Sequence, residues 1–136
     1  MDKKFLDNIL SEAINLFKEN NISFGKSKLK KILDFEPNHF DALNLMGIAL
    51  SKEKNYQNSL EFFENAIKIN PNSEQTHLNI GLCQMNLKKF DDAKKSLKSA
   101  IDINSQNEQA YFNLSIIHQE QLNFEDALIS INNCLK

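Results

Sequence analysis

Apolar side chains recur at helical spacing along the whole sequence. One stretch contains two successive series with spacings of three, four and seven residues: Leu43, Met46 and Leu50, then Leu60, Phe63 and Ile67. Such spacings place side chains on one face of an α-helix, and polar residues occupy most positions between them. The pattern therefore predicts pairs of amphipathic helices and an all-α fold.

The same pattern returns after 34 residues. Pro37 and Pro71 are 34 residues apart, and so are Gly47 and Gly81. Extending this period gives four units that align without insertions: residues 6–39, 40–73, 74–107 and 108–136, the last of them truncated. No unit can bury its own apolar face, so neighbouring units must stack. We interpret residues 1–136 as a single domain of stacked helical hairpins.

Turn residues and small residues recur at fixed places and indicate where the helices of each unit begin, end and approach one another. The second helices of units two, three and four are expected to begin near residues 55–57, 89–92 and 123–126. The prolines stop one helix and place the next, because proline lacks the amide hydrogen and restricts the residue before it. Gly47, Gly81 and Ser115 share one place in their units, and their small size lets neighbouring helices approach closely.

This 34-residue pattern resembles the tetratricopeptide repeat, a helix–turn–helix unit. In unit two the resemblance rests on Leu43, Gly47, Phe63, Ala66 and Pro71, and units three and four repeat most of these places. Unit one matches more weakly. The resemblance implies a right-handed superhelix of about eight helices, in which the first helix of each unit lines a concave groove.

The resemblance also implies which side chains line that groove. The candidates share the groove-facing places of units two to four, and they are Asn44, Ile48, Gln75, Asn79, Leu82, Gln109, Phe112, Asn113 and Ile116. Carboxamides both donate and accept hydrogen bonds, so they suit the backbone of an extended peptide. The apolar members would accept alternate side chains of such a peptide.

Asn79 and Asn113 occupy the sixth place of their units. This resembles the asparagine ladder of the O-linked N-acetylglucosamine transferases, which grips the peptide backbone. Leu45 stands at the corresponding place of unit two, so only two rungs match. Asparagine occurs 19 times in the sequence. Asn79 and Asn113 as ordinary solvated groove residues therefore remain the alternative.

A more specific peptide-binding motif of the same family is absent from this sequence. Chaperone-binding members hold an acidic C-terminus with a clamp of two lysines, two asparagines and one arginine. The corresponding residues of units two to four are Asn44, Ile48, Asn79, Gln109 and Asn113, of which only Asn79 matches and none is cationic. We therefore do not expect this chain to capture a Glu-Glu-Val-Asp tail.

Composition narrows the class of partner. The net charge is −2, and all 16 basic residues are lysine. A chain so near neutrality lacks the basic excess of a dedicated nucleic-acid or membrane-surface binder. Lysines cluster within residues 26–31 and 88–98, mainly on the second helices, where we expect a solvated outer face. A salt-sensitive strip for an acidic partner or RNA is the alternative.

No motif in the chain points to chemistry or to a membrane. His39, His77 and His118 do not have metal-ligand spacing, and the three glycines form no phosphate-binding loop. Carboxylates are scattered over polar positions rather than paired. There is no leader-like apolar segment near Met1 and no long apolar run. We expect a non-catalytic, cytoplasmic protein without cofactor or metal and without a membrane partner.

An apolar stripe occupies the last residues of the chain. Leu128, Ile131, Cys134 and Leu135 recur at helical spacing, and no further unit follows to cover them. Stripes of this kind mark interfaces. The chain continuing in a longer protein, two chains packing end to end, and a frayed terminus are the three explanations. We expect self-association through this uncapped helix.

Together these features predict an adaptor or scaffold that binds an extended peptide in its concave groove. The alternative is the N-terminal substrate-recruiting region of a larger transferase, such as a glycosyltransferase, with the catalytic domain outside this chain. A structural role in assembly through the convex face or the open end is a third possibility.

Overall fold

The computed structural model describes residues 2–134, and its regular structure is entirely helical. The seven helices of this part of the chain are α1 (Lys3–Lys18), α2 (Ile22–Phe35), α3 (Phe40–Lys52), α4 (Tyr56–Ile69), α5 (Glu74–Asn86), α6 (Phe90–Ile103) and α7 (Glu108–Cys134). No strand occurs among the described residues, which confirms the expected all-α fold.

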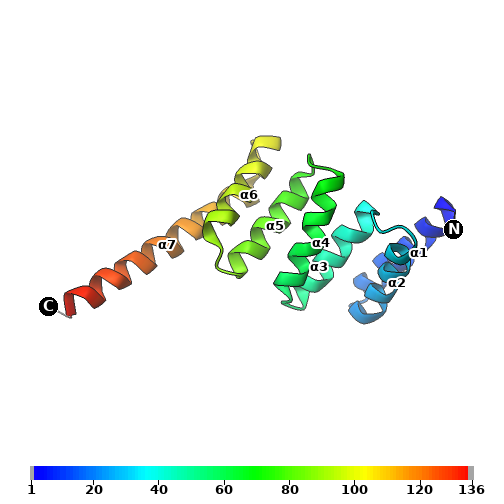
Figure 1. Cartoon of the computed structure of the whole chain (residues 1–136), viewed down its shortest axis with the longest axis horizontal. Helices are drawn as coiled ribbons and strands as arrows, with labels where there is room; N and C mark the ends of the chain where they lie inside the picture. The colour runs from blue at the N-terminus through cyan, green and yellow to red at the C-terminus, as the bar shows by residue number, and fades with distance from the viewer. Residues whose placement is uncertain (1, 135–136) are drawn as a thin grey trace.

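The first six helices form three hairpins, α1–α2, α3–α4 and α5–α6, which follow one another along the long axis of the molecule (Figure 1). Each hairpin turns at one residue with a left-handed backbone: Asn20 at φ 61°, Lys54 at φ 63° and Lys88 at φ 62°. These three residues are 34 positions apart. The period of the sequence is therefore a period of the backbone.

Side-chain caps begin the first helix of each later unit. The Nδ1 atom of His39 accepts a hydrogen bond from the Ala42 amide at 3.1 Å, and Ser73 Oγ accepts one from the Thr76 amide at 3.3 Å. Asn107 Oδ1 does the same for the Ala110 amide at 2.9 Å. These bonds satisfy amide groups that a helix start leaves without a backbone partner. The helices α3, α5 and α7 thus start at equivalent places.

The hairpins close tightly because small residues face large ones. Gly47 of α3 lies against Phe63 of α4, and Gly81 of α5 lies against Leu97 of α6. All four residues are buried. A third pair, Gly25 and Phe17, joins α2 to α1. The expectation that small residues permit close helix approach is confirmed at Gly47 and Gly81, whereas Ser115 is exposed on α7 and receives no second helix.

The helix α7 departs from the expected plan. A turn and a new helix were expected near residues 123–126, giving about eight helices, but α7 is continuous over its 27 residues. Leu122 stands 34 positions after Lys88, where the other units take a left-handed backbone. That conformation costs an L-residue about 1–2 kcal/mol. Lys54 and Lys88 bear the same cost in the turns that do form, so backbone strain alone does not set the difference. The structure has three hairpins followed by one long helix.

None of the helices between residues 2 and 134 combines the length and the hydropathy that a membrane span requires.

Candidate functional site

A pocket of about 290 Å³ lies between α3 and α5. Ile48 from α3 and Asn79 and Leu82 from α5 line it, and all three were predicted groove residues. Lys52 and Tyr56 complete one side. The repeat register thus brought together residues more than 30 positions apart. The pocket combines apolar walls with one cation and two carboxamides, those of Asn79 and Asn86, of which Asn86 Nδ2 donates to the Leu82 carbonyl at 2.8 Å.

The Asn79 side chain is half-buried and oriented by its own helix. Its Oδ1 accepts a hydrogen bond from Gln75 Nε2 at 3.2 Å. Its Nδ2 makes no hydrogen bond within residues 2–134 and lies at the pocket wall. A carboxamide held through its oxygen in this way presents its amide hydrogens to a ligand.

Asn113 occupies the same place on α7. The residue is only 6% exposed, and its Nδ2 finds no acceptor among the residues that the structure describes. A buried amide without a partner costs about 1–3 kcal/mol. A ligand carbonyl oxygen would remove that cost only after the Asn113 side chain rotates outward, because its Nδ2 atom is buried in this conformation. Asn113 is therefore a polar group that gains a hydrogen bond if it turns toward the groove.

Asn44 has a different environment. Its Oδ1 accepts a hydrogen bond from Thr76 Oγ1 at 2.9 Å, and its Nδ2 donates to the Phe40 carbonyl at 3.1 Å. Both ends of this carboxamide are thus used within the protein. The first bond joins α3 to α5. The structure places Asn44 at a joint between repeats rather than in the α3–α5 pocket.

The remaining predicted groove residues lie outside that pocket. Gln75 and Gln109 are exposed, Ile116 is half-buried, and Phe112 is 65% exposed on α7. An aromatic side chain of such exposure offers a contact surface of the kind that anchors partners. The candidate site consists of the α3–α5 pocket and the adjoining face of α7.

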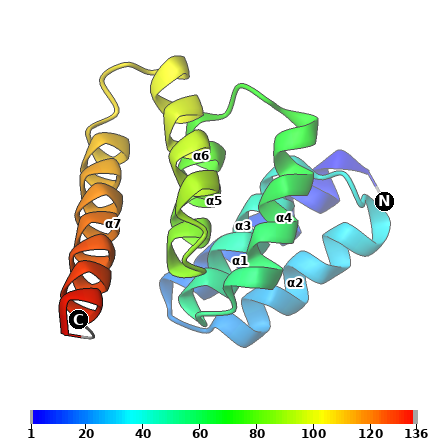
Figure 2. The ribbon, with the colours of Figure 1, turned by 60° about the vertical axis from the view of Figure 1, so that its left-hand side comes forward.

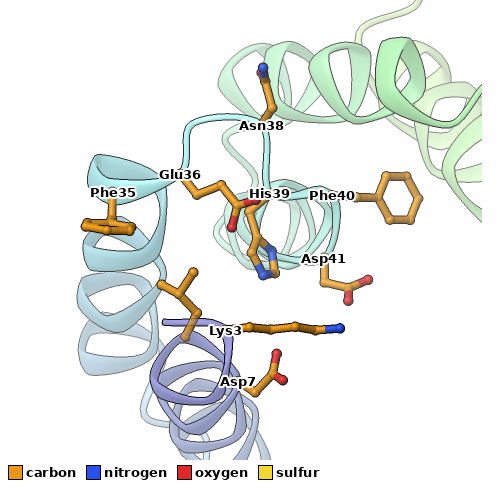
Figure 3. Close-up of a pocket in the computed structure, with 9 residues that line it drawn as sticks. Lys3, Asp7, Phe35, Glu36, Asn38, His39, Phe40 and Asp41 are labelled. Atoms are coloured by element: carbon orange, nitrogen blue, oxygen red, sulfur yellow. The ribbon is translucent and has the colours of Figure 1, made fainter. Parts of the chain in front are cut away.

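A larger pocket, of about 590 Å³, lies near the N-terminus and was not predicted. Lys3 and Asp7 of α1 face Asp41 of α3 around it, with Phe35 and His39 on its other walls (Figure 3). The only signal in the sequence was that Asp7 and Asp41 share the second place of their units. The pocket mixes charges of both signs, and His39 is already used as a helix cap.

The predicted end-to-end interface lies on the second half of α7. Leu128 is 46% exposed and Ile131 is 56% exposed. The side chain of Cys134 and the whole of Leu135 lie outside the described residues. Sequence reasoning missed Leu122, Phe124 and Ile129, which are also exposed on this half of the helix.

The lysine clusters are partly neutralised by acidic neighbours. Lys26 pairs with Glu53, and Lys28 Nζ lies 2.9 Å from a Glu12 carboxylate oxygen. In the second cluster Lys94 pairs with Asp91 at 3.6 Å. Pairs of this kind contribute little stability, but they reduce the positive field that an anion would meet. The outer face is therefore a weaker candidate site than the groove.

Comparison with known families supports the repeat assignment. Residues 50–115 match the family model described as tetratricopeptide repeat. This segment extends from the end of α3 into the first half of α7. No curated protein sequence matches the chain.

Solved structures share the fold over most of the chain. The first TPR of Spaghetti (RPAP3), bound to the HSP90 peptide SRMEEVD, has a TM-score of 0.85 and 17% identity, over 90% of this chain and 97% of that one. MamA 41-end from Desulfovibrio magneticus RS-1 has a TM-score of 0.82 and 18% identity, over 94% and 72%. The Sgt2 TPR domain from Aspergillus fumigatus has a TM-score of 0.81 and 15% identity, over 89% and 82%.

At these identities the likeness concerns the fold alone. The matched segment and the shared fold together support a tetratricopeptide repeat protein. The finer resemblance to the O-linked N-acetylglucosamine transferases stays a prediction.

Proposed function

We propose that this chain is a non-catalytic binding module that holds an extended peptide along α3, α5 and α7. The observation that carries the proposal is the pair of unused amide donors at one place of two successive repeats. Asn79 Nδ2 lies at the wall of the α3–α5 pocket, and Asn113 Nδ2 is buried without a partner among the described residues. Asn79 is half-buried and is suited to a backbone carbonyl oxygen as it lies, whereas the Asn113 side chain must first rotate toward the groove.

The spacing of these donors fits an extended ligand. Packed helices lie about 8–10 Å apart, and an extended chain advances about 3.3 Å per residue. Asn79 and Asn113 would therefore bond carbonyl groups about three residues apart. Ile48, Leu82 and Ile116 are partly exposed beside them and would contact apolar side chains of the same peptide. Backbone bonds would supply affinity and the apolar contacts would supply preference.

The charge of the site selects an internal peptide segment rather than an acidic terminus. Lys52 is the single cation among the residues that line the α3–α5 pocket. A lone lysine is a point charge and cannot form the bidentate pairs with which arginine holds a carboxylate. The ligand is therefore an uncharged or weakly charged stretch with alternating apolar side chains.

The test begins with an array of acetylated, amidated nine-residue peptides of alternating apolar and small polar residues. The affinities of the peptides that bind are then measured by fluorescence anisotropy. The Asn79→Ala, Asn113→Ala double variant should lose about 5- to 150-fold in affinity, because each lost hydrogen bond is worth about 0.5–1.5 kcal/mol. Circular dichroism establishes that the variant is folded.

The matched control is Asn58→Ala with Asn65→Ala, which removes two exposed amides from α4. It should retain affinity within about twofold, since neither amide bonds another described residue. A second variant, Lys95→Glu with Lys98→Glu, tests the outer face of α6, where both lysines are exposed. Loss of binding in this variant, with the groove variant unaffected, would move the site to the convex face and refute the proposal.

A further inference from the structure

The second half of α7 has the residue pattern of a helix that is packed in the other units. Phe124, Leu128 and Ile131 stand 68 positions after Tyr56, Leu60 and Phe63 of α4. In α4, Leu60 and Phe63 are buried in the hairpin. In α7, Phe124 is 68% exposed, and Leu128 and Ile131 are exposed as well. The same apolar face is thus present without the helix that covers it in the other units, and Phe124 borders a pocket of about 660 Å³ beside Phe90 at the start of α6.

The first half of α7 carries the helix face against which the second helix packs in the closed hairpins. Ser115 holds the place of Gly47 and Gly81, which receive Phe63 and Leu97 in the closed hairpins. Ser115 and Gln119 are exposed. Figures 1 and 2 show α7 running straight past α6, with one side free of any helix. The helix therefore contains both halves of a hairpin that has not closed.

Backbone strain at the missing turn favours the open form. Closing the hairpin within one chain would require a left-handed backbone at Leu122, the place of Asn20, Lys54 and Lys88. That conformation costs leucine about as much as it costs Lys54 and Lys88, and more than it costs Asn20, so the strain is one contribution that favours the straight helix. A bond from Lys94 Nζ to Gln121 Oε1, at 3.2 Å, also ties the middle of the straight helix to α6.

We propose that two copies of this chain exchange the second halves of α7. The two helices lie antiparallel, so that the second half of each packs against the first half of the other. Ile131 of one copy then occupies the place opposite Ser115 of the second, as Phe63 does opposite Gly47. The exposed apolar face of each copy is thus covered by the other copy, and Leu122 remains helical in each chain.

The size of such an interface fits a stable dimer. Each copy contributes one half-helix of each kind, each of about three turns. Two helix–helix contacts of that length bury an area on the order of the 800 Å² per partner that specific interfaces show. The exchange follows the packing plan of the closed hairpins, except that Ser115 faces the smaller Ile131 where Gly47 faces Phe63 and Gly81 faces Leu97, and it is independent of peptide binding.

The contacts of unit two provide a sharp test. Ser51 Oγ and Ser59 Oγ lie 2.6 Å apart across the α3–α4 hairpin, and Gln119 and Ala127 hold their places in unit four. On one straight helix residues 119 and 127 are about 12 Å apart, too far for a disulfide. We would therefore introduce Gln119→Cys and Ala127→Cys in a chain with Cys83→Ala and Cys134→Ala. Alanine stands at the equivalent Ala49 and Ala66.

After oxidation, most of this variant should migrate as a covalent dimer without reductant and have twice the mass of the 15.7 kDa chain in light scattering. The control pair Gln119→Cys and Glu125→Cys, whose second cysteine replaces the equivalent of exposed Gln57, should give little covalent dimer. An oxidised monomer would show that the hairpin closes within one chain. A monomer at several hundred micromolar, or a dimer that does not cross-link, would equally overturn the proposal.

The hinge is tested separately in the same cysteine background. Leu122→Gly permits the left-handed turn, so the covalent product should change from dimer to oxidised monomer. Leu122→Ala keeps the helix and should leave the dimer unchanged. If Leu122→Gly still gives only the dimer, the backbone at residue 122 does not control the exchange, and this part of the proposal fails.

Discussion

The backbone of Gly47 lies against the aromatic ring of Phe63. A Cβ atom on Gly47 would come within 2.6 Å of the Phe63 Cε1 atom. Gly81 has the same relationship with Leu97, where the nearest side-chain atom would be 2.9 Å away. The two hairpins thus use the same close approach with different partners. The aromatic ring makes the demand for glycine strongest at Gly47.

Gly47→Ala should destabilise the protein by about 1–3 kcal/mol through overpacking, although alanine favours a helix over glycine by about 1 kcal/mol. Adding Phe63→Leu should recover part of that loss of stability, because leucine is the residue that faces the equivalent glycine in the α5–α6 hairpin. Urea unfolding of the four chains in this double-mutant cycle measures the coupling. Strictly additive effects of Gly47→Ala and Phe63→Leu would contradict a direct steric contact.

Replacing Asn44 should lower the stability of the protein, whereas replacing Asn79 should weaken peptide binding. Asn44→Ala removes the Asn44 Oδ1 acceptor of the buried Thr76 hydroxyl, which keeps Ser73 Oγ as a partner at 2.8 Å, and should cost about 0.5–1.5 kcal/mol. Asn79→Ala breaks only an exposed bond to Gln75 and should change the free energy of unfolding by less than about 0.5 kcal/mol. Chemical denaturation of both variants compares them. Unchanged stability in Asn44→Ala, together with weaker peptide binding, would restore the groove role expected from the sequence.

The left-handed turn residues offer a route to higher stability. Lys54 is exposed at φ 63°, a conformation that glycine adopts without strain. Lys54→Gly should stabilise the protein by up to about 1 kcal/mol, which raises Tm by about 2–4 °C in a chain of this length. Lys54→Ala keeps the backbone penalty and is the matched control. A lower Tm for the glycine variant would show that Lys54 makes a contact worth more than the strain.

The peptide SRMEEVD should not bind in the manner seen in its structural neighbour. The clamp positions include Asn44, Ile48 and Gln109, and none supplies a cation for the terminal carboxylate. Isothermal titration should detect no binding below about 1 mM, and no difference between the free acid and its C-terminal amide. A marked preference for the free acid would reveal an anion site that the groove residues do not indicate.

The sequence by itself was enough to predict the helical hairpins, because helix periodicity and turn residues act over short distances along the chain. It also predicted the close approach at Gly47 and Gly81, because small residues recur at that place, but Phe63 and Leu97 as their partners came from the structure. The grouping of Ile48, Asn79 and Leu82 followed from the resemblance to the tetratricopeptide repeat, which implies the groove-facing places. All of these features repeat, and each can be inferred from its neighbours in register.

Only the tertiary structure distinguished residues of the same type. Asn44, Asn79 and Asn113 have the same chemistry, but one joins two repeats, one is held through its oxygen, and one is buried without a partner. The continuous α7 is the other case. Its second half has the pattern of a packed helix, yet whether the turn at Leu122 forms depends on the balance between backbone strain and the packing of faces far apart in the chain. That balance is set in three dimensions, and the local period carries no information about it.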